Sequence, residues 1–310
     1  MEKEHNKTKR LTLAGYRSNR TQTVFAVWVL SPVFAYLVTF FIIPIIGTFL
    51  ISFQYWNTLD PKHSFVGLEN YQWNLRDPVF WQSLRNTLYY TIGYVLSTTL
   101  LGLVLALWIN SIRREFGRIA EALFFLPVVI SWAIASLLFA WIYQPSYGIL
   151  NYYLGKVGLG PYRWLSHSST VMPSIILMSV WKTVGYAMVI LRAGLLSIPE
   201  TFYEAAKIDG ARKWQVFRKI TLPLLQPSLL LVTVTNVIWS LQVFTQVYIM
   251  TGGGPGTSSS VLVFRMYQLA FKFFQMDRGA SLAVILFLMI MAVTILQVRL
   301  NPGGFRYYYE

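Results

Sequence analysis

The chain has 310 residues, of which 55% are hydrophobic and 12% are charged, and its mean hydropathy is +0.50. Soluble domains carry roughly 25% charged residues, so this composition excludes an ordinary soluble protein and predicts an all-α, polytopic membrane protein. Cysteine is absent, which excludes disulfides, thiolate metal sites and a cysteine nucleophile. The formal charge of +14 does not indicate nucleic-acid binding, because the basic residues flank apolar runs as topology signals do.

Apolar periodicity predicts six transmembrane helices within a membrane domain of residues 23–300, between tails of residues 1–22 and 301–310. The first run exceeds 25 residues and lacks a clear cleavage site, so it predicts an uncleaved span rather than a signal peptide. It contains Pro32 and Pro44, which predict a kink. The predicted spans are Thr23–Phe53, Leu84–Asn110, Ala120–Tyr143, Val171–Leu196, Pro227–Thr251 and Gly279–Val298.

The positive-inside rule gives these spans a direction. With both termini inside, the predicted cytoplasmic segments hold sixteen Lys and Arg residues, and the longer outer segments hold eight. We therefore expect both termini, and the loop of residues 197–223, on the cytoplasmic side. The aromatic residues of the outer segments fit either an interfacial belt or a docking surface for a substrate-delivering protein.

The most informative motif is the polar stretch Glu204-Ala205-Ala206-x3-Gly210-x9-Ile220-x-Leu222-Pro223 between the fourth and fifth spans. The two alanines leave room for another protein to approach the backbone, and Glu204 offers it a carboxylate. Gly210 permits the positive φ that turns one short helix into the next, and Asp209 is positioned to hydrogen-bond that turn. An ordinary helix–Gly–helix connection between two spans is the alternative interpretation.

Three further segments occur in a characteristic order: Val66-Gly67-Leu68-Glu69-Asn70-Tyr71, Trp181-Lys182-x-x-Gly185-Tyr186, and Thr251-Gly252-Gly253-Gly254-Pro255-Gly256. Together with the Glu204 motif, they resemble the permease subunits of type I ABC importers for carbohydrates, in particular the first, maltose-permease-like subunit. The resemblance implies the type I importer fold and a cytoplasmic loop that couples the permease to ATPase subunits. The residues it assigns to coupling are Glu204, Ala205, Ala206, Asp209, Gly210, Ile220, Leu222 and Pro223.

The same resemblance implies a substrate site near the bilayer midplane. The residues it assigns to this site are Ser179, Lys182, Thr183, Tyr186, Trp239, Ser240, Gln242 and Val243. The first four share one helical face at i, i+3, i+4 and i+7, and an aromatic ring beside hydroxyl and amide groups suits a sugar. A polar seam that packs helix against helix is the alternative. The ammonium of Lys182 must face water, a carbonyl, a partner subunit or the substrate.

We therefore predict a non-catalytic permease subunit, in a prokaryotic inner membrane, that translocates a sugar or oligosaccharide. The chain lacks a phosphate-binding Gly-x4-Gly-Lys-Ser/Thr loop, so we expect no cofactor or metal on it and ATP–Mg on partner subunits. The expected partners are a second homologous permease, two ATPase subunits, an extracytoplasmic binding protein and membrane lipid. The alternatives are an importer of glycerol 3-phosphate or an acidic oligosaccharide, an intramembrane enzyme, and a non-catalytic receptor.

Overall fold

The computed structural model describes residues 20–60 and 62–300. The chain divides into two units, residues 1–50 and 51–310, and the tail of residues 301–310, like residues 1–19, lies outside the described residues. The first unit is one apolar rod of α1 (Arg20–Leu37), η2 (Val38–Ile42) and α2 (Ile43–Ile51). The π-helical segment η2 lies between Pro32 and Pro44, and residues Val27–Ile51 form one helix that is long and apolar enough to cross a bilayer; the kink expected from the two prolines stays a prediction.

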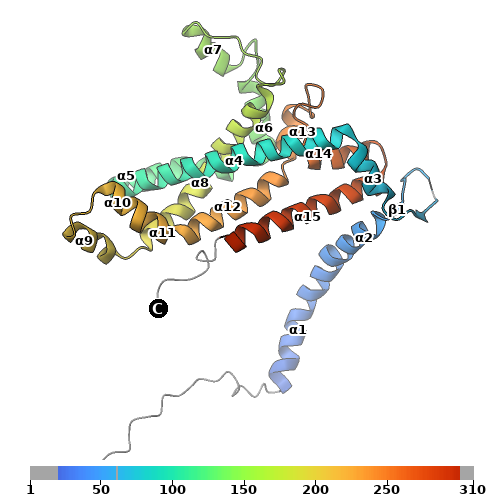
Figure 1. Ribbon diagram of the computed structural model, residues 1–310, viewed down its shortest axis with the longest axis horizontal. Helices are drawn as coiled ribbons and strands as arrows, with labels where there is room; N and C mark the ends of the chain where they lie inside the picture. The colour runs from blue at the N-terminus through green and yellow to red at the C-terminus, as the bar shows by residue number, and fades with distance from the viewer. Residues whose placement is uncertain (1–19, 61, 301–310) are drawn as a thin grey trace, which may run out of the picture. The chain divides into compact units, whose positions relative to one another are not determined.

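The second unit is a helical bundle (Figure 1). It begins with the short hairpin of β1 (Gln54–Tyr55) and β2 (Ser64–Phe65). The helices that follow are α3 (Glu69–Arg76), α4 (Pro78–Ser111), α5 (Arg114–Val129), α6 (Trp132–Ile142), α7 (Ile149–Lys156), α8 (Val171–Leu196), α9 (Glu200–Ile208), α10 (Lys213–Val216), η3 (Phe217–Thr221), α11 (Leu222–Leu224), α12 (Gln226–Leu241), α13 (Thr245–Met250), α14 (Leu262–Tyr267), η4 (Gln268–Lys272) and α15 (Met276–Leu300).

The centre of the bundle is the pair α4 and α8. A Cβ added at Gly102 of α4 would lie 2.8 Å from the Cβ of Ala187 on α8, so the two backbones pack closely because both residues are small. Tyr90 and Tyr94 stack at 5.6 Å on the buried face of α4. The N-terminal halves of α4 and α8 pack in one apolar cluster with Tyr143 and Met250. Their C-terminal halves pack in a second apolar cluster, which includes Leu225.

Two predicted spans are not single straight helices. Among the described residues, four helices are long and apolar enough to cross a bilayer, and two bent helix pairs raise this to six if each pair is one span. The prediction of one helix over Ala120–Tyr143 is wrong, because α5 ends at Val129 and α6 begins at Trp132 after a 97° bend. Pro127 lies two residues from the end of α5 and cannot donate a main-chain hydrogen bond. The chain leaves the helix at Ile130, whose ψ is 137°, and the Ser131 hydroxyl then accepts from Ile134 N and caps the new helix.

The predicted fifth span, Pro227–Thr251, is also interrupted. Helix α12 ends at Leu241, and α13 begins only at Thr245. Between them Phe244 adopts φ −145° and ψ −60°, outside the helical region. Before α12 the chain bends again, by 64°, between α11 and α12. The non-helical residues 242–244 lie beside the break between α5 and α6, and this juxtaposition creates the site described below.

Ion pairs fasten the two ends of the bundle. At the N-terminal end of α4, Asp77 caps the helix through Val79 N at 3.0 Å and accepts from Arg265 of α14 at 2.8 Å. Asn74 of α3 donates to Ser281 of α15 at 2.8 Å. Near the other end, Arg192 of α8 pairs with Glu121 of α5. These contacts join α4 to α14, α3 to α15 and α8 to α5.

Candidate functional site

One cavity of about 330 Å³ lies where the two broken segments meet near the middle of α8. Its wall consists of Val128, Trp132, Lys182, Thr183, Tyr186, Trp239, Gln242, Val243, Phe244, Thr245 and Gln246. Six of the eight substrate residues predicted from the resemblance are in this set. The exceptions are Ser179 and Ser240, which are fully or almost fully buried and hydrogen-bond Ile175 O and Val237 O within their own helices.

Two aromatic rings form one wall of this inner cavity. Tyr186 of α8 and Trp239 of α12 lie with ring centroids 5.1 Å apart and planes tilted by 47°. Trp239 keeps 42% of its surface exposed, so its ring is available to a ligand. Gln246, which also lines the cavity, donates a long hydrogen bond of 3.4 Å to the buried Tyr90 hydroxyl. The wall thus offers apolar ring faces together with amide and hydroxyl groups.

Lys182 is the one charged residue that lines the inner cavity, and its surroundings answer the question that the sequence left open. Its ammonium donates to the carbonyl oxygen of Val128 at 3.2 Å and lies 4.7 Å from the ring centre of Trp132. The side chain is only 5% exposed. Because Val128 is in the last turn of α5, its carbonyl has lost its intrahelical partner at the break, and Lys182 replaces that partner. The cation therefore also balances the partial negative charge of the helix end.

Gly185 of the Trp181–Tyr186 segment has a structural role beside this site. A Cβ added there would lie 2.1 Å from the carbonyl oxygen of Phe124 in α5, a distance that no side chain can occupy. The glycine therefore lets α5 approach α8 closely enough for Lys182 to reach Val128. Sequence reasoning assigned Lys182 to the site but did not identify Trp132, Phe244, Thr245 or Gln246, since only the two breaks bring these residues to the cavity.

The second candidate site is the motif that contains Glu204, which forms α9, a turn and α10 at the C-terminal end of α8 (left in Figure 1). Gly210 has φ +68°. The amide of Ala211 donates to Ala206 O at 2.9 Å, and that of Gly210 donates to Lys207 O at 3.2 Å, which together make a Schellman helix ending. The main chain closes this turn, and the structure gives the Asp209 side chain no hydrogen bond within its described residues.

The residues of this motif fall into an exposed group and a buried or half-buried group. Glu204, Ala205, Asp209 and Pro223 are exposed, whereas Ala206 is 6% exposed and Ile220 and Leu222 are half-buried. Tyr203 reaches Thr221 at 3.3 Å and holds α9 against the segment before α11. Sequence reasoning missed three large apolar side chains that are exposed on α9 and α10: Phe202, Ile208 and Trp214, at 45%, 87% and 67% exposed. The sequence signal that could have identified them is the occurrence of large apolar residues within an otherwise polar loop.

A helical bundle with broken spans, a polar cavity at mid-helix and an exposed loop at one end defines a multi-span membrane transport subunit. A family model described as the binding-protein-dependent transport system inner membrane component matches residues 69–303. The chain belongs to this family and is an ABC importer permease embedded in the membrane.

Relatives and solved structures agree with that assignment. A probable ABC transporter permease of Pyrococcus horikoshii is 37% identical and covers 86% of this chain and 95% of the relative. The trehalose/maltose transport system permease of Thermococcus litoralis is 36% identical, over 89% of this chain and 92% of that protein. A crystal structure of a bacterial ABC transporter involved in the import of alginate contains a chain with a TM-score of 0.81 and 22% identity, which covers 93% of this chain and 100% of that one. At this identity the structural match shows the shared fold alone.

Proposed function

We propose that the permease carries a sugar or oligosaccharide through the inner cavity. The observation that supports this best is the aromatic pair Tyr186 and Trp239, which lines the same cavity as the amide side chains of Gln242 and Gln246. Flat apolar ring faces suit the C–H faces of a pyranose, and neutral donors and acceptors suit its hydroxyl groups. The cavity volume of about 330 Å³ lies within the range of small-molecule sites.

The names of the relatives support the same class of substrate. Besides the trehalose/maltose permease, they include the permease of a sulfoquinovosyl glycerol transport system from Agrobacterium fabrum, 36% identical over 76% of this chain. An arabinooligosaccharide permease of Bacillus subtilis is 33% identical over 89% of this chain. These names span several glycosides, so the family membership favours a carbohydrate without selecting one.

Lys182 is the reason to consider a second candidate, import of an acidic glycoside or of glycerol 3-phosphate. An anionic group in the inner cavity would meet this ammonium. However, the charge is already used by the Val128 carbonyl and by the face of Trp132, and the cavity wall holds no second cation. We therefore favour an uncharged sugar.

We further propose that the surface of α9 and α10 receives a cytoplasmic ATPase subunit. Exposed apolar side chains such as Ile208 and Trp214 supply contact area to a partner, and Glu204 supplies a carboxylate for a basic residue. The ATPase subunits would hydrolyse ATP–Mg, and this chain would receive their motion. A second permease would cover the inner cavity, since the exposed Gln242 and Trp239 would otherwise face lipid.

Uptake of labelled sugars into membrane vesicles tests the proposal. Tyr186→Ala and Trp239→Ala should raise the half-saturating concentration, because each removes a ring face from the cavity. Leu177→Ala and Leu231→Ala are matched controls, since these side chains lie on the same two helices but are 56% and 55% exposed. If the aromatic variants import neutral sugars as the controls do, the inner cavity is not the substrate site.

A competition assay separates the two candidate substrates. Neutral oligosaccharides and their uronate-containing counterparts are offered together, and an uncharged substrate predicts that the acidic sugars compete poorly. Preferential import of the acidic sugars, lost in Lys182→Gln, would establish the second candidate instead.

A further inference from the structure

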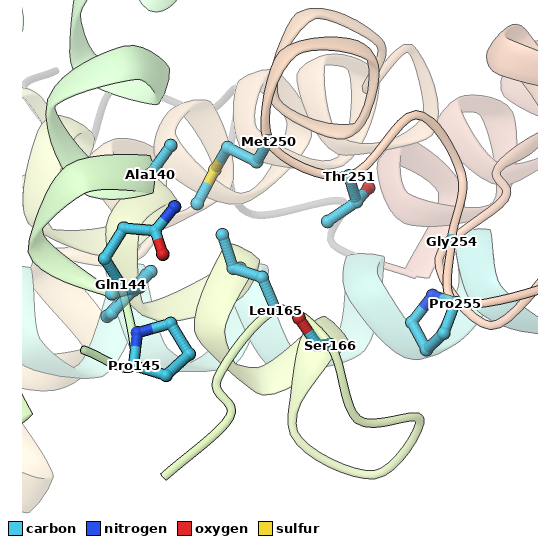
Figure 2. Close-up of a pocket in the computed structure, with 10 residues that line it drawn as sticks. Ala140, Gln144, Pro145, Leu165, Ser166, Met250, Thr251, Gly254 and Pro255 are labelled. Carbon is cyan, nitrogen blue, oxygen red and sulfur yellow. The ribbon is translucent and has the colours of Figure 1, made fainter. Parts of the chain in front are cut away.

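A second pocket, of about 360 Å³, lies near the N-terminal end of α8. Its wall combines the end of α6, the loop before α8 and the turn after α13, and includes Tyr143, Gln144, Leu165, Ser166, Met250 and Pro255. Figure 2 shows the side chains of Gln144, Leu165 and Met250 converging on one hollow, with Ser166 beside it. The α9–α10 surface follows the opposite end of α8. Helix α8 has 26 residues, which correspond to a length of about 39 Å.

Two helices connect this outer pocket to the inner cavity. Helix α6 begins at Trp132 in the inner cavity and ends beside Tyr143 and Gln144 of the outer pocket. Helix α13 begins at Thr245 in the inner cavity and ends at Met250 of the outer pocket. The two helices pack against each other. The 11 residues of α6 place the pockets about 15 Å apart, so one pair of helices spans both sites.

The chemistry of the outer pocket resembles that of the inner cavity. None of its lining residues is charged. The structure gives the Gln144 amide and the Ser166 hydroxyl no hydrogen bond within its described residues, so both groups can bind a ligand. Thr251 is different, because its hydroxyl is already engaged by Val247 O at 2.9 Å and Ser259 Oγ at 2.8 Å. Leu165 and the prolines supply apolar faces between the polar groups.

We propose that the outer pocket is a second binding site for the transported glycoside. The glycoside occupies the outer pocket before it reaches the inner cavity. This inference rests on the proposed function. A neutral polyhydroxyl ligand matches a pocket with free amide and hydroxyl groups, apolar faces and no charge. A protein segment docked in the same hollow is the competing occupant, and the test below distinguishes it. Because α6 and α13 line both sites, ligand in the outer pocket contacts the same helices that must move to admit it further.

The absence of cysteine from the chain makes the test direct, since a single introduced thiol is the only one on this subunit. Ser166→Cys, in the intact transporter with its partner subunits in right-side-out vesicles, is labelled with a membrane-impermeant maleimide. Maltotriose, arabinotriose and raffinose are the probes, each added with and without the binding protein. We expect at least one of these sugars, without the binding protein, to slow labelling. Ser146→Cys is the control, because Ser146 is exposed in the loop between α6 and α7 and does not line the pocket, and no sugar should protect it.

Three results would overturn the proposal: no labelling of Ser166→Cys from outside, protection by the binding protein alone, or no protection by a sugar that the wild type imports. The last result separates this inference from the proposed function, because uptake by the wild type is measured in parallel. A wild type that imports none of a wide panel of neutral sugars would refute the proposed function instead.

Gln144→Leu provides a second readout. It should raise the half-saturating concentration of the imported sugar about threefold to tenfold, as expected for one lost hydrogen bond, with the maximal rate retained. Ser146→Ala should leave both values unchanged. An unchanged half-saturating concentration in Gln144→Leu would contradict the site.

Discussion

Replacing Lys182 separates the structural role of its charge from any role in binding substrate. Lys182→Met removes a charged hydrogen bond to Val128 O, worth about 1.5–3 kcal/mol, and a cation–π contact with Trp132, worth about 0.5–2 kcal/mol. It also removes the cost of placing an ammonium in the membrane, about 2.5–3.5 kcal/mol on insertion scales. These contributions largely offset each other, so Lys182→Met should change the stability of the assembled permease by no more than about 2.5 kcal/mol.

Lys182→Glu should behave very differently. It loses both contacts, keeps the cost of a buried charge at about 2.5 kcal/mol or more, and places an anion at the negative end of α5, which costs about 0.3–1 kcal/mol more. The two variants should therefore differ by about 3 kcal/mol or more, or roughly a hundredfold in the folded-to-unfolded ratio.

The assay is the yield of assembled transporter in detergent and its Tm. Lys272→Glu is the control, since Lys272 is exposed outside the spans and should tolerate the reversal. If Lys182→Glu assembles and melts like Lys182→Met, the ammonium does not stabilise the break between α5 and α6. If Lys182→Met is stable yet transports slowly, the ammonium is needed for movement or for substrate binding rather than for folding.

Variants at three further positions test other parts of the structure. Gly210→Val should weaken co-purification of the ATPase, because its φ of +68° costs a β-branched residue about 1–2 kcal/mol, whereas Gly210→Asn should be tolerated; equal behaviour of the two would remove the turn argument. Trp214→Ala should lower ATPase-coupled uptake while leaving the Tm unchanged, and normal uptake would exclude it from the ATPase contact. Asp77→Ala should lower the Tm more than Asp77→Asn. Both variants lose the charge pair with Arg265, but only the asparagine amide can still cap α4 at Val79 N. Equal Tm values for the two variants would show that the cap contributes nothing.

The sequence by itself determined the fold class and the family. Composition and the length of the apolar runs require a helical membrane protein, since a bilayer accepts only elements that satisfy their own backbone groups. The spacing of Glu204, Gly210 and Pro223 predicted the exposed loop, because a helix–turn–helix with a positive φ is a local property. The second, fourth and sixth spans agree with α4, α8 and α15, where long apolar runs lack interruptions.

Only the tertiary structure decided where the long apolar runs break and what those breaks bring together. Hydropathy measures only how apolar a segment is. The apolar runs continue through Pro127 and through residues 242–244, so hydropathy does not detect the bends. Whether a proline or a polar residue breaks a helix depends on a neighbour that can satisfy the freed backbone groups. Lys182 supplies that neighbour for Val128, and Gly185 supplies the space. Both facts involve residues more than fifty positions apart in sequence, which no local pattern can relate.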